Sequence, residues 1–183
     1  MIRLILGTII DCALILFGAF VDGVSKIGRK RIPTFGTWAR RPALIVLPGC
    51  KASVERIEDA VERIEAWAGA RRIFSEVRGT DWRERMGRNG VIYVEQQFSA
   101  DDGAHYVAAV DDAGEIQQVR IRLPMDEYVI EHTAVVEHLI LHGLGCEHVE
   151  FKGHVLSHQL DEHAWSVTGV RNALRRCCRF RSV

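Results

Sequence analysis

The sequence predicts a fold of the α/β type, more narrowly α+β, and three observations lead to that prediction. An apolar run over Ala43–Leu47 ends at a Pro-Gly pair and is followed by a helical pattern. Two further apolar runs flank the turn sequence Asp111-Asp112-Ala113-Gly114, which is a hairpin signal. The last third of the chain returns to helical patterns. With 183 residues and 48% hydrophobic side chains, the chain can form one domain with a hydrophobic core plus an appendage.

Each element of this prediction follows from a local pattern. Ala43–Leu47 is apolar throughout, as expected of a strand that is buried on both faces. Ser53–Ala68 places its apolar side chains on one stripe of a helix and its charged side chains elsewhere. The other strands are expected at Arg72–Val77, Gly90–Phe98, Tyr106–Val110 and Ile116–Leu123, and the other helices at Glu131–Gly143 and Gly169–Arg179.

The N-terminal end is expected to be an appendage to this domain. Residues 4–21 are apolar apart from Asp11, and as a helix they would extend about 27 Å, close to the thickness of a bilayer core. Asp11 at mid-membrane would cost about 3 kcal/mol, so the alternative is a helix buried in a protein assembly. The expected organisation is a hydrophobic helix in residues 1–24, a basic linker in residues 25–42 and one domain in residues 43–183.

Charge is distributed unevenly, although the total is zero. Residues 1–50 carry seven Lys or Arg and two acids, residues 171–183 carry five Arg and no acid, and the body between them is acidic. The basic ends are either solvated faces or surfaces that dock onto anionic lipid, nucleic acid or an acidic partner. No aromatic interleaving or known motif accompanies the C-terminal arginines, so nucleic acid is not expected as a partner.

The cysteines are expected to be mostly buried thiols. Their number is odd and their spacing matches no zinc ribbon, so a complete disulfide framework is not expected. One of them, Cys146, lies among the histidines described next and could approach a metal there. The five are Cys12, Cys50, Cys146, Cys177 and Cys178.

Three histidines near residue 140 have the spacing of a zinc site. Residues four apart on a helix lie about 40° apart around its axis, so His138 and His142 point the same way. Gly145 can adopt the positive φ that ends a helix and turns the chain, which allows His148 to return toward the first two. Three imidazole ligands with an open fourth position are typical of catalytic zinc.

The segment H-L-I-L-H-G-L-G-C-E-H resembles the motif H-E-x-x-H-x-x-G-x-x-H of the metzincin peptidases, in particular the matrixins. Matrixins follow this motif with a turn that carries a methionine eight residues after the third histidine and a glycine three before it. Gly153 and Leu156 occupy those offsets here. Small matrixin-like proteins of phages and bacteria also show a later tryptophan and a Thr-x-Gly, which Trp165, Thr168 and Gly169 match.

The resemblance covers residues 42–179. It implies zinc as the cofactor, held by His138, His142 and His148, and a twisted mixed sheet with an active-site helix and a C-terminal helix. Because the family cleaves peptide bonds, it also implies a peptide segment as a partner.

Two departures from the family pattern bear on activity. Leu139 stands where the family has its catalytic glutamate, and Leu156 stands where it has methionine. Losing a positioned acid–base group typically lowers a rate by roughly 10²- to 10⁴-fold. Glu137 is about 120° around the helix from the midpoint of the two helical histidines, so we expect it to face away from the metal. Glu147 is the other candidate for the missing acid.

A second group of histidines follows the turn. His154 and His158 are again four residues apart, and His163, Asp161 and Glu162 lie close by in the sequence. This group could hold a second metal, although matrixin-like turns are irregular rather than helical. His132 is expected on another helical face, as a surface residue or behind the ligands.

Three functions are consistent with the sequence. The first is a degenerate, matrixin-like zinc domain with weak or no proteolytic activity. The second is a structural or interaction protein of a larger assembly, such as a phage virion, which would reuse the same fold. The third is an active peptidase that uses Glu147 or a carboxylate of the substrate. The expected location is therefore a membrane, reached through residues 4–21, or a virion or other macromolecular assembly.

Overall fold

The fold is known from a computed structural model, which describes residues 31–70, 72–80, 87–97, 105–150, 152–158 and 166–179. A compact unit begins at Ile32 and contains every helix and strand described below. The expected hydrophobic helix in residues 1–24 lies outside the described residues. Within the described ranges, no helix combines the length and the apolar character needed to cross a bilayer.

A five-stranded mixed sheet forms the base of this unit, in the order β2-β1-β3-β5-β4. The neighbours β1 with β2, β1 with β3, and β3 with β5 are parallel, whereas β4 runs antiparallel to β5 at the edge. This confirms the prediction of a mixed α/β fold. The strands are β1 (Ala43–Val46), β2 (Glu76–Gly79), β3 (Val91–Gln96), β4 (His105–Val110) and β5 (Ile116–Leu123).

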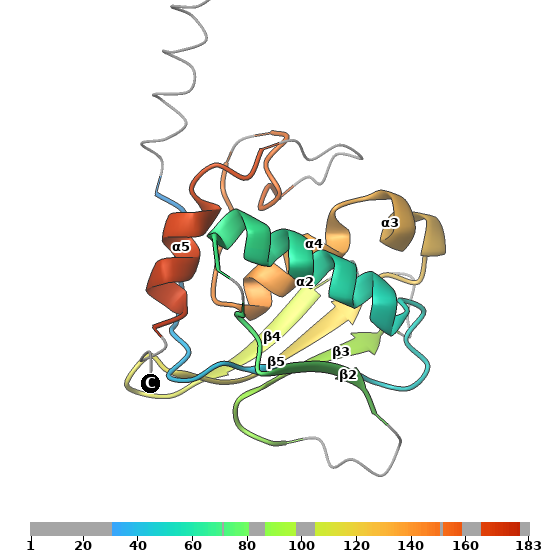
Figure 1. The fold of residues 1–183 in the computed structure, drawn as a ribbon, viewed down its shortest axis with the longest axis horizontal. Helices are drawn as coiled ribbons and strands as arrows, with labels where there is room; N and C mark the ends of the chain where they lie inside the picture. The colour runs from blue at the N-terminus through green and yellow to red at the C-terminus, as the bar shows by residue number, and fades with distance from the viewer. Residues whose placement is uncertain are drawn as a thin grey trace, which may run out of the picture. The chain divides into compact units, whose positions relative to one another are not determined.

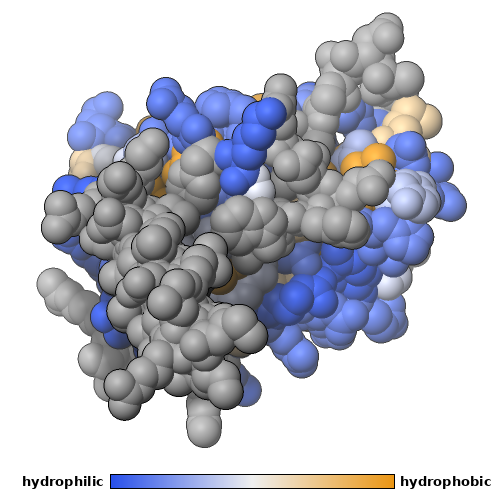
Figure 2. Space-filling view, turned by 90° about the horizontal axis from the view of Figure 1, so that it is seen from above, coloured by the Kyte–Doolittle hydropathy of each residue, from blue (hydrophilic) through white to orange (hydrophobic). Residues whose placement is uncertain are grey.

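The long helices lie on one side of the sheet (Figure 1). They are α2 (Val54–Ala68), α4 (Val135–Gly143) and α5 (Val170–Cys177). The hydroxyl of Ser53 caps α2 by accepting from the backbone N–H of Arg56. Apolar side chains of these helices and of the facing side of the sheet form one core. Seen from above, the described surface is mostly hydrophilic, with hydrophobic side chains confined to small areas (Figure 2).

The single helix expected at Glu131–Gly143 is two helices, α3 (Glu127–His132) and α4, so that prediction was wrong. Thr133 lies between them with extended backbone, φ −120° and ψ 167°. Its hydroxyl donates to the carbonyl of Val129 and accepts from the backbone N–H of Val135. Threonine side chains compete with the helical backbone for hydrogen bonds in this way, and here the competition ends α3.

The strand expected at Arg72–Val77 lies later in the chain, as β2. Ile73 and Phe74 are buried, but as part of the loop that enters the strand. The backbone N–H of Ile73 donates to a carboxylate oxygen of Glu65 on α2, so it is not available for strand pairing. The apolar sequence thus correctly indicated that these side chains are buried, but it did not decide whether their backbone forms a strand.

Residues 32–42, which were expected to belong to a linker, pack into the compact unit. Ile32 and Trp38 are each 1% exposed. The indole N–H of Trp38 donates to the carbonyl of Gly143, and so satisfies a free carbonyl at the end of α4. The folded domain therefore begins at Ile32 rather than at residue 43. Prolines, glycines and arginines around the two apolar side chains gave this segment the composition of a linker.

Candidate metal centre

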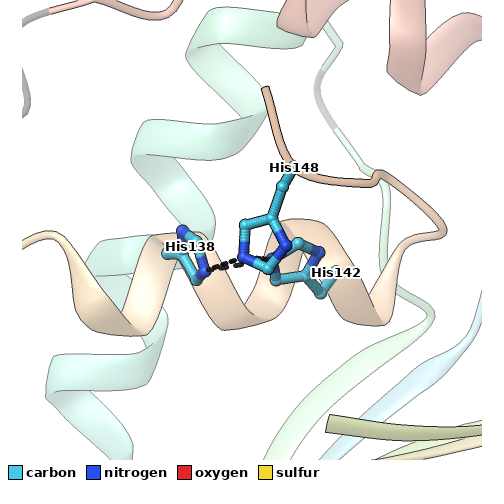
Figure 3. A group of neighbouring side chains, drawn as sticks. All are labelled: His138, His142 and His148. Atoms are coloured by element: carbon cyan, nitrogen blue, oxygen red, sulfur yellow. Dashed lines mark hydrogen bonds between the residues drawn. The ribbon is translucent and has the colours of Figure 1, made fainter. Parts of the chain in front are cut away.

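The three histidines of the motif converge on one point (Figure 3). The Nε2 atoms of His138 and His142 are 3.0 Å apart, those of His142 and His148 are 3.1 Å apart, and those of His148 and His138 are 3.2 Å apart. Among the described residues, these three form a group whose ligand atoms could hold one metal ion. Two of the rings come from α4 and the third comes from the segment after it.

The protons on these rings are assigned by their other partners. Nδ1 of His138 lies 2.7 Å from the carbonyl oxygen of Val155, and Nδ1 of His142 lies 2.7 Å from that of Cys146. A carbonyl oxygen only accepts, so both Nδ1 atoms carry a proton and donate it. In the neutral rings both Nε2 atoms therefore present lone pairs to each other, which repel. A proton on Nε2 of His148 can bridge them only in part, whereas a cation satisfies all three nitrogens.

The size of the nitrogen triangle fits a zinc ion. Zinc binds imidazole nitrogen at about 2.0–2.1 Å, and two nitrogens of a tetrahedral site at that bond length are about 3.3 Å apart. The observed separations of 3.0–3.2 Å are close to this value. The backbone acceptors on Nδ1 fix the ring orientation of both helical ligands, as is usual for metal-bound histidine.

Burial keeps the helical ligands in the form that binds metal. His142 is fully buried and His138 is 7% exposed. Burial, together with the neighbouring imidazoles, lowers the pKa of His138 to about 4 and that of His142 to about 3. The pKa of His148, which is half-buried, is also lowered, again mainly by burial. All three rings are therefore neutral at pH 7, as metal ligation requires.

The bend after α4 is held in place by the segment that precedes β1. Gly145 has φ +100°, which confirms the expected turn, and its carbonyl accepts from the backbone N–H of Phe35 at 3.0 Å. The backbone N–H of Glu147 donates to the carbonyl of Pro33, also at 3.0 Å. These contacts flank Cys146, whose carbonyl orients His142, and they direct the chain back toward the metal site at His148.

A turn over residues 153–156 contacts the histidine helix through the carbonyl of Val155. Gly153 has φ +74°, and Leu156 is fully buried in the core. The backbone N–H of Val149 donates to the carbonyl of Leu156 at 2.9 Å. Between the two turn positions lies Val155, whose carbonyl accepts from His138. Leu156 thus contributes a buried apolar side chain to this turn.

Of the second histidine group, the structure describes His154 and His158, and the two have different partners. His154 is buried, and both of its ring nitrogens are used: Nδ1 accepts from the backbone N–H of Leu156, and Nε2 donates to the carbonyl of Thr168. Its role is therefore to stabilise the turn. His158 instead stacks on His148, with ring centroids 4.0 Å apart. His163, like Asp161, Glu162 and Trp165, lies outside the described residues.

The structure describes the position where the family has its glutamate and the two acids that could replace it. Leu139, at the position of the family's glutamate, is 1% exposed and belongs to the core. Glu137 is 4% exposed, and its carboxylate pairs with Arg56 and Arg63 of α2, so it is held toward that helix. Glu147 is half-buried. Burial raises the pKa of the Tyr106 phenol, and the nearby charge of Glu147 raises it further.

Three contributors to the site were not predicted from the sequence. Two are the backbone carbonyls of Val155 and Cys146, for which no side-chain pattern gives a signal. The third is Tyr106 of β4, whose ring stacks on that of His142 with centroids 4.5 Å apart and 12° between the planes. Phe35 stacks in turn on Tyr106. Aromatic packing therefore fixes the buried ligand from the sheet side.

Comparison with protein-family models finds no match to the chain, and comparison with curated proteins finds none either. The class of protein is therefore indicated by the geometry of the site. Three histidines within metal-binding distance, above a mixed α/β sheet, are compatible with a metzincin-like site.

Proposed function

We propose that this chain is a matrixin-like zinc-binding domain whose proteolytic activity is weak or absent. The observation that supports the proposal is the convergence of three neutral imidazoles beside a buried leucine at the position of the general base. The antiparallel edge strand and the turn beneath the histidines are also consistent with the family resemblance.

Zinc is the proposed metal because of the chemistry of the donors. Neutral imidazole suits zinc, copper, nickel and iron, and three nitrogens at tetrahedral separations favour zinc. When bound, zinc would act as a Lewis acid and lower the pKa of a bound water. This chain offers Leu139 where a proton acceptor would be needed, so we expect peptide hydrolysis to be slow or undetectable.

The test of the zinc site is a measurement of metal content. The purified full chain should contain about one zinc per molecule, and His142→Ala should abolish it. His132→Ala is a matched control, because His132 is an exposed histidine at the end of the preceding helix and its ring contacts that of Tyr128 rather than the candidate ligands. Zinc that is absent from the wild type, or that survives in His142→Ala, would contradict the proposal.

The test of lost activity restores the acid. If the metal keeps an open position and the carboxylate reaches it, Leu139→Glu should raise the rate of peptide cleavage by up to roughly 10²- to 10⁴-fold. Leu139→Gln is the control, because glutamine has a similar size but cannot accept the proton. Equal rates for both variants, with zinc retained, would leave metal binding as the only function of the site.

An observation at the sheet edge favours a second candidate function, the binding of an extended protein segment. Among the described strands, β4 pairs with β5 alone, and its side chains Val107 and Val110 are 55% and 40% exposed. An edge strand offers free backbone donors and acceptors to a further strand. Tyr106 of the same strand stacks on His142, so a segment bound at this edge would lie beside the histidines.

Binding of a peptide library, measured by fluorescence anisotropy, tests this second function. A double substitution of Val107 and Val110 by lysine should weaken any binding that uses the edge, and unchanged binding would exclude it. Attachment to a membrane, or to an assembly such as a phage virion, through residues 4–21 is part of the same proposal. Fractionation of the full chain and of a chain that lacks those residues would test it.

A further inference from the structure

His158, which was expected to belong to the second histidine group, lies beside one of the three candidate ligands. Its ring centroid is 4.0 Å from that of His148, with 25° between the ring planes. The centroids of the three ligands themselves are separated by 4.3–5.1 Å. His158 is thus in ring contact with one of the three, although its nitrogens do not belong to the group of converging ligand atoms.

The backbone places His158 beside His148. Val149 and Ser157 form a parallel bridge, which brings their two segments side by side, and the rings of the neighbouring residues His148 and His158 stack on each other. The backbone N–H of Ser157 also donates to the carbonyl of His154 at 2.9 Å, which fixes the end of the turn. The position of His158 is therefore set by the same turn that orients His138.

The ring of His158 is available for a ligand. It is exposed, and within the described part of the chain its nitrogens have no hydrogen-bond partner. His154 differs in this respect, since both of its nitrogens are used.

We propose that His158 is the fourth protein ligand of the metal held by His138, His142 and His148. This inference rests on the proposed metal site and specifies its coordination. The exposed side chain has to rotate from its stacked position, and it gives up only the ring contact with His148. Four imidazoles would close the tetrahedral shell, which is the arrangement of a structural rather than a catalytic zinc site. A closed shell also accounts for leucine at position 139, because a metal without an open position has no use for a general base.

The experiment uses the full chain with cobalt(II) in place of zinc, because cobalt reports its coordination in the visible spectrum. We compare the wild type, His158→Ala and the control His132→Ala. The His158 variant should bind cobalt at least about tenfold more weakly, the lower end of the range for lost support of a metal ligand. Azide should change the spectrum of the variant, in which a coordination position is open, and leave the wild-type and control spectra unchanged.

X-ray absorption on the zinc-loaded wild type gives a second readout that needs no variant. It should count four imidazoles per zinc. Three imidazoles plus an oxygen ligand, or equal azide binding and equal cobalt affinity in wild type and His158→Ala, would overturn the fourth ligand and leave the three-histidine site standing. Failure of the wild type to bind either metal would instead overturn the proposed function itself.

Discussion

Gly145→Ala should damage both the fold and the metal site. Gly145 has φ +100°, where side-chain-bearing residues are strained by about 1–3 kcal/mol. A Cβ at this position would also lie 2.9 Å from the carbonyl oxygen of Gly36 and 3.0 Å from Cδ1 of Ile116. Crowding of this kind typically costs another 1–3 kcal/mol. The substitution should therefore lower the free energy of unfolding by about 2–6 kcal/mol.

The matched control is Gly114→Ala. Gly114 also has positive φ, +76°, but a Cβ there would meet nothing within 4 Å. It should lose only the strain of about 1–3 kcal/mol, so the difference between the two variants measures the crowding at Gly145. Urea unfolding followed by circular dichroism, with a chelator present, gives both values. Equal losses would refute the assignment of the extra cost to the contact with Gly36.

The same pair of variants tests the link between the bend and the metal. Gly145 precedes Cys146, whose carbonyl orients His142, and leads to the ligand His148. Displacing such a support typically weakens metal binding by 10- to 100-fold. Gly145→Ala should show that loss in a competition with a chelator, whereas Gly114→Ala should bind zinc as the wild type does. Unchanged affinity in Gly145→Ala would show that the bend does not position the ligands.

Three further outcomes follow from the buried contacts. Trp38→Phe removes the donor to the carbonyl of Gly143 and should lower the free energy of unfolding by about 1–3 kcal/mol in urea, more than a surface substitution. Leu139→Ala should cost about 2–5 kcal/mol in the same assay, because Leu139 is 1% exposed in the core; a loss below 1 kcal/mol would contradict that burial. Without metal, the folded pKa values of about 4 for His138 and about 3 for His142 lie below the ordinary 6.5, so the unfolded chain takes up protons first. Stability should therefore be complete above about pH 6.5 and fall by several kcal/mol toward pH 4, and His142→Asn should reduce the pH dependence.

Much of the fold followed from local patterns. The apolar run of β1, the amphipathic stripe of α2 and the hairpin between β4 and β5 each predicted the observed element, because each is decided by neighbours in the sequence. The break at Thr133 and the late start of β2 were not predicted. At both places the backbone conformation is stabilised by hydrogen bonds between side chain and backbone. The pattern of apolar residues gives no information about such bonds.

The three candidate ligands could also be predicted from the local sequence. His138 and His142 share a helix face, and a glycine three residues after the second one allows the chain to turn back. These relations depend on helix geometry and on the freedom of glycine at positive φ, and both can be read from spacing. The expectation that Leu139 stands in place of a catalytic acid rests on the resemblance to matrixins alone.

Other properties of the site were decided by the tertiary structure. The carbonyl of Val155, the ring of Tyr106 and the packing of residues 32–38 around the bend come from segments far from the histidine helix. Tertiary structure also gave His154 and His158 different surroundings. His154 is held in the turn by the carbonyl of Thr168, whereas His158 stacks on His148. The sequence alone determined which side chains can bind a metal, because spacing on a helix fixes direction. Only tertiary structure decided which protons they carry and which neighbours they have, because those depend on hydrogen bonds and burial between distant parts of the chain.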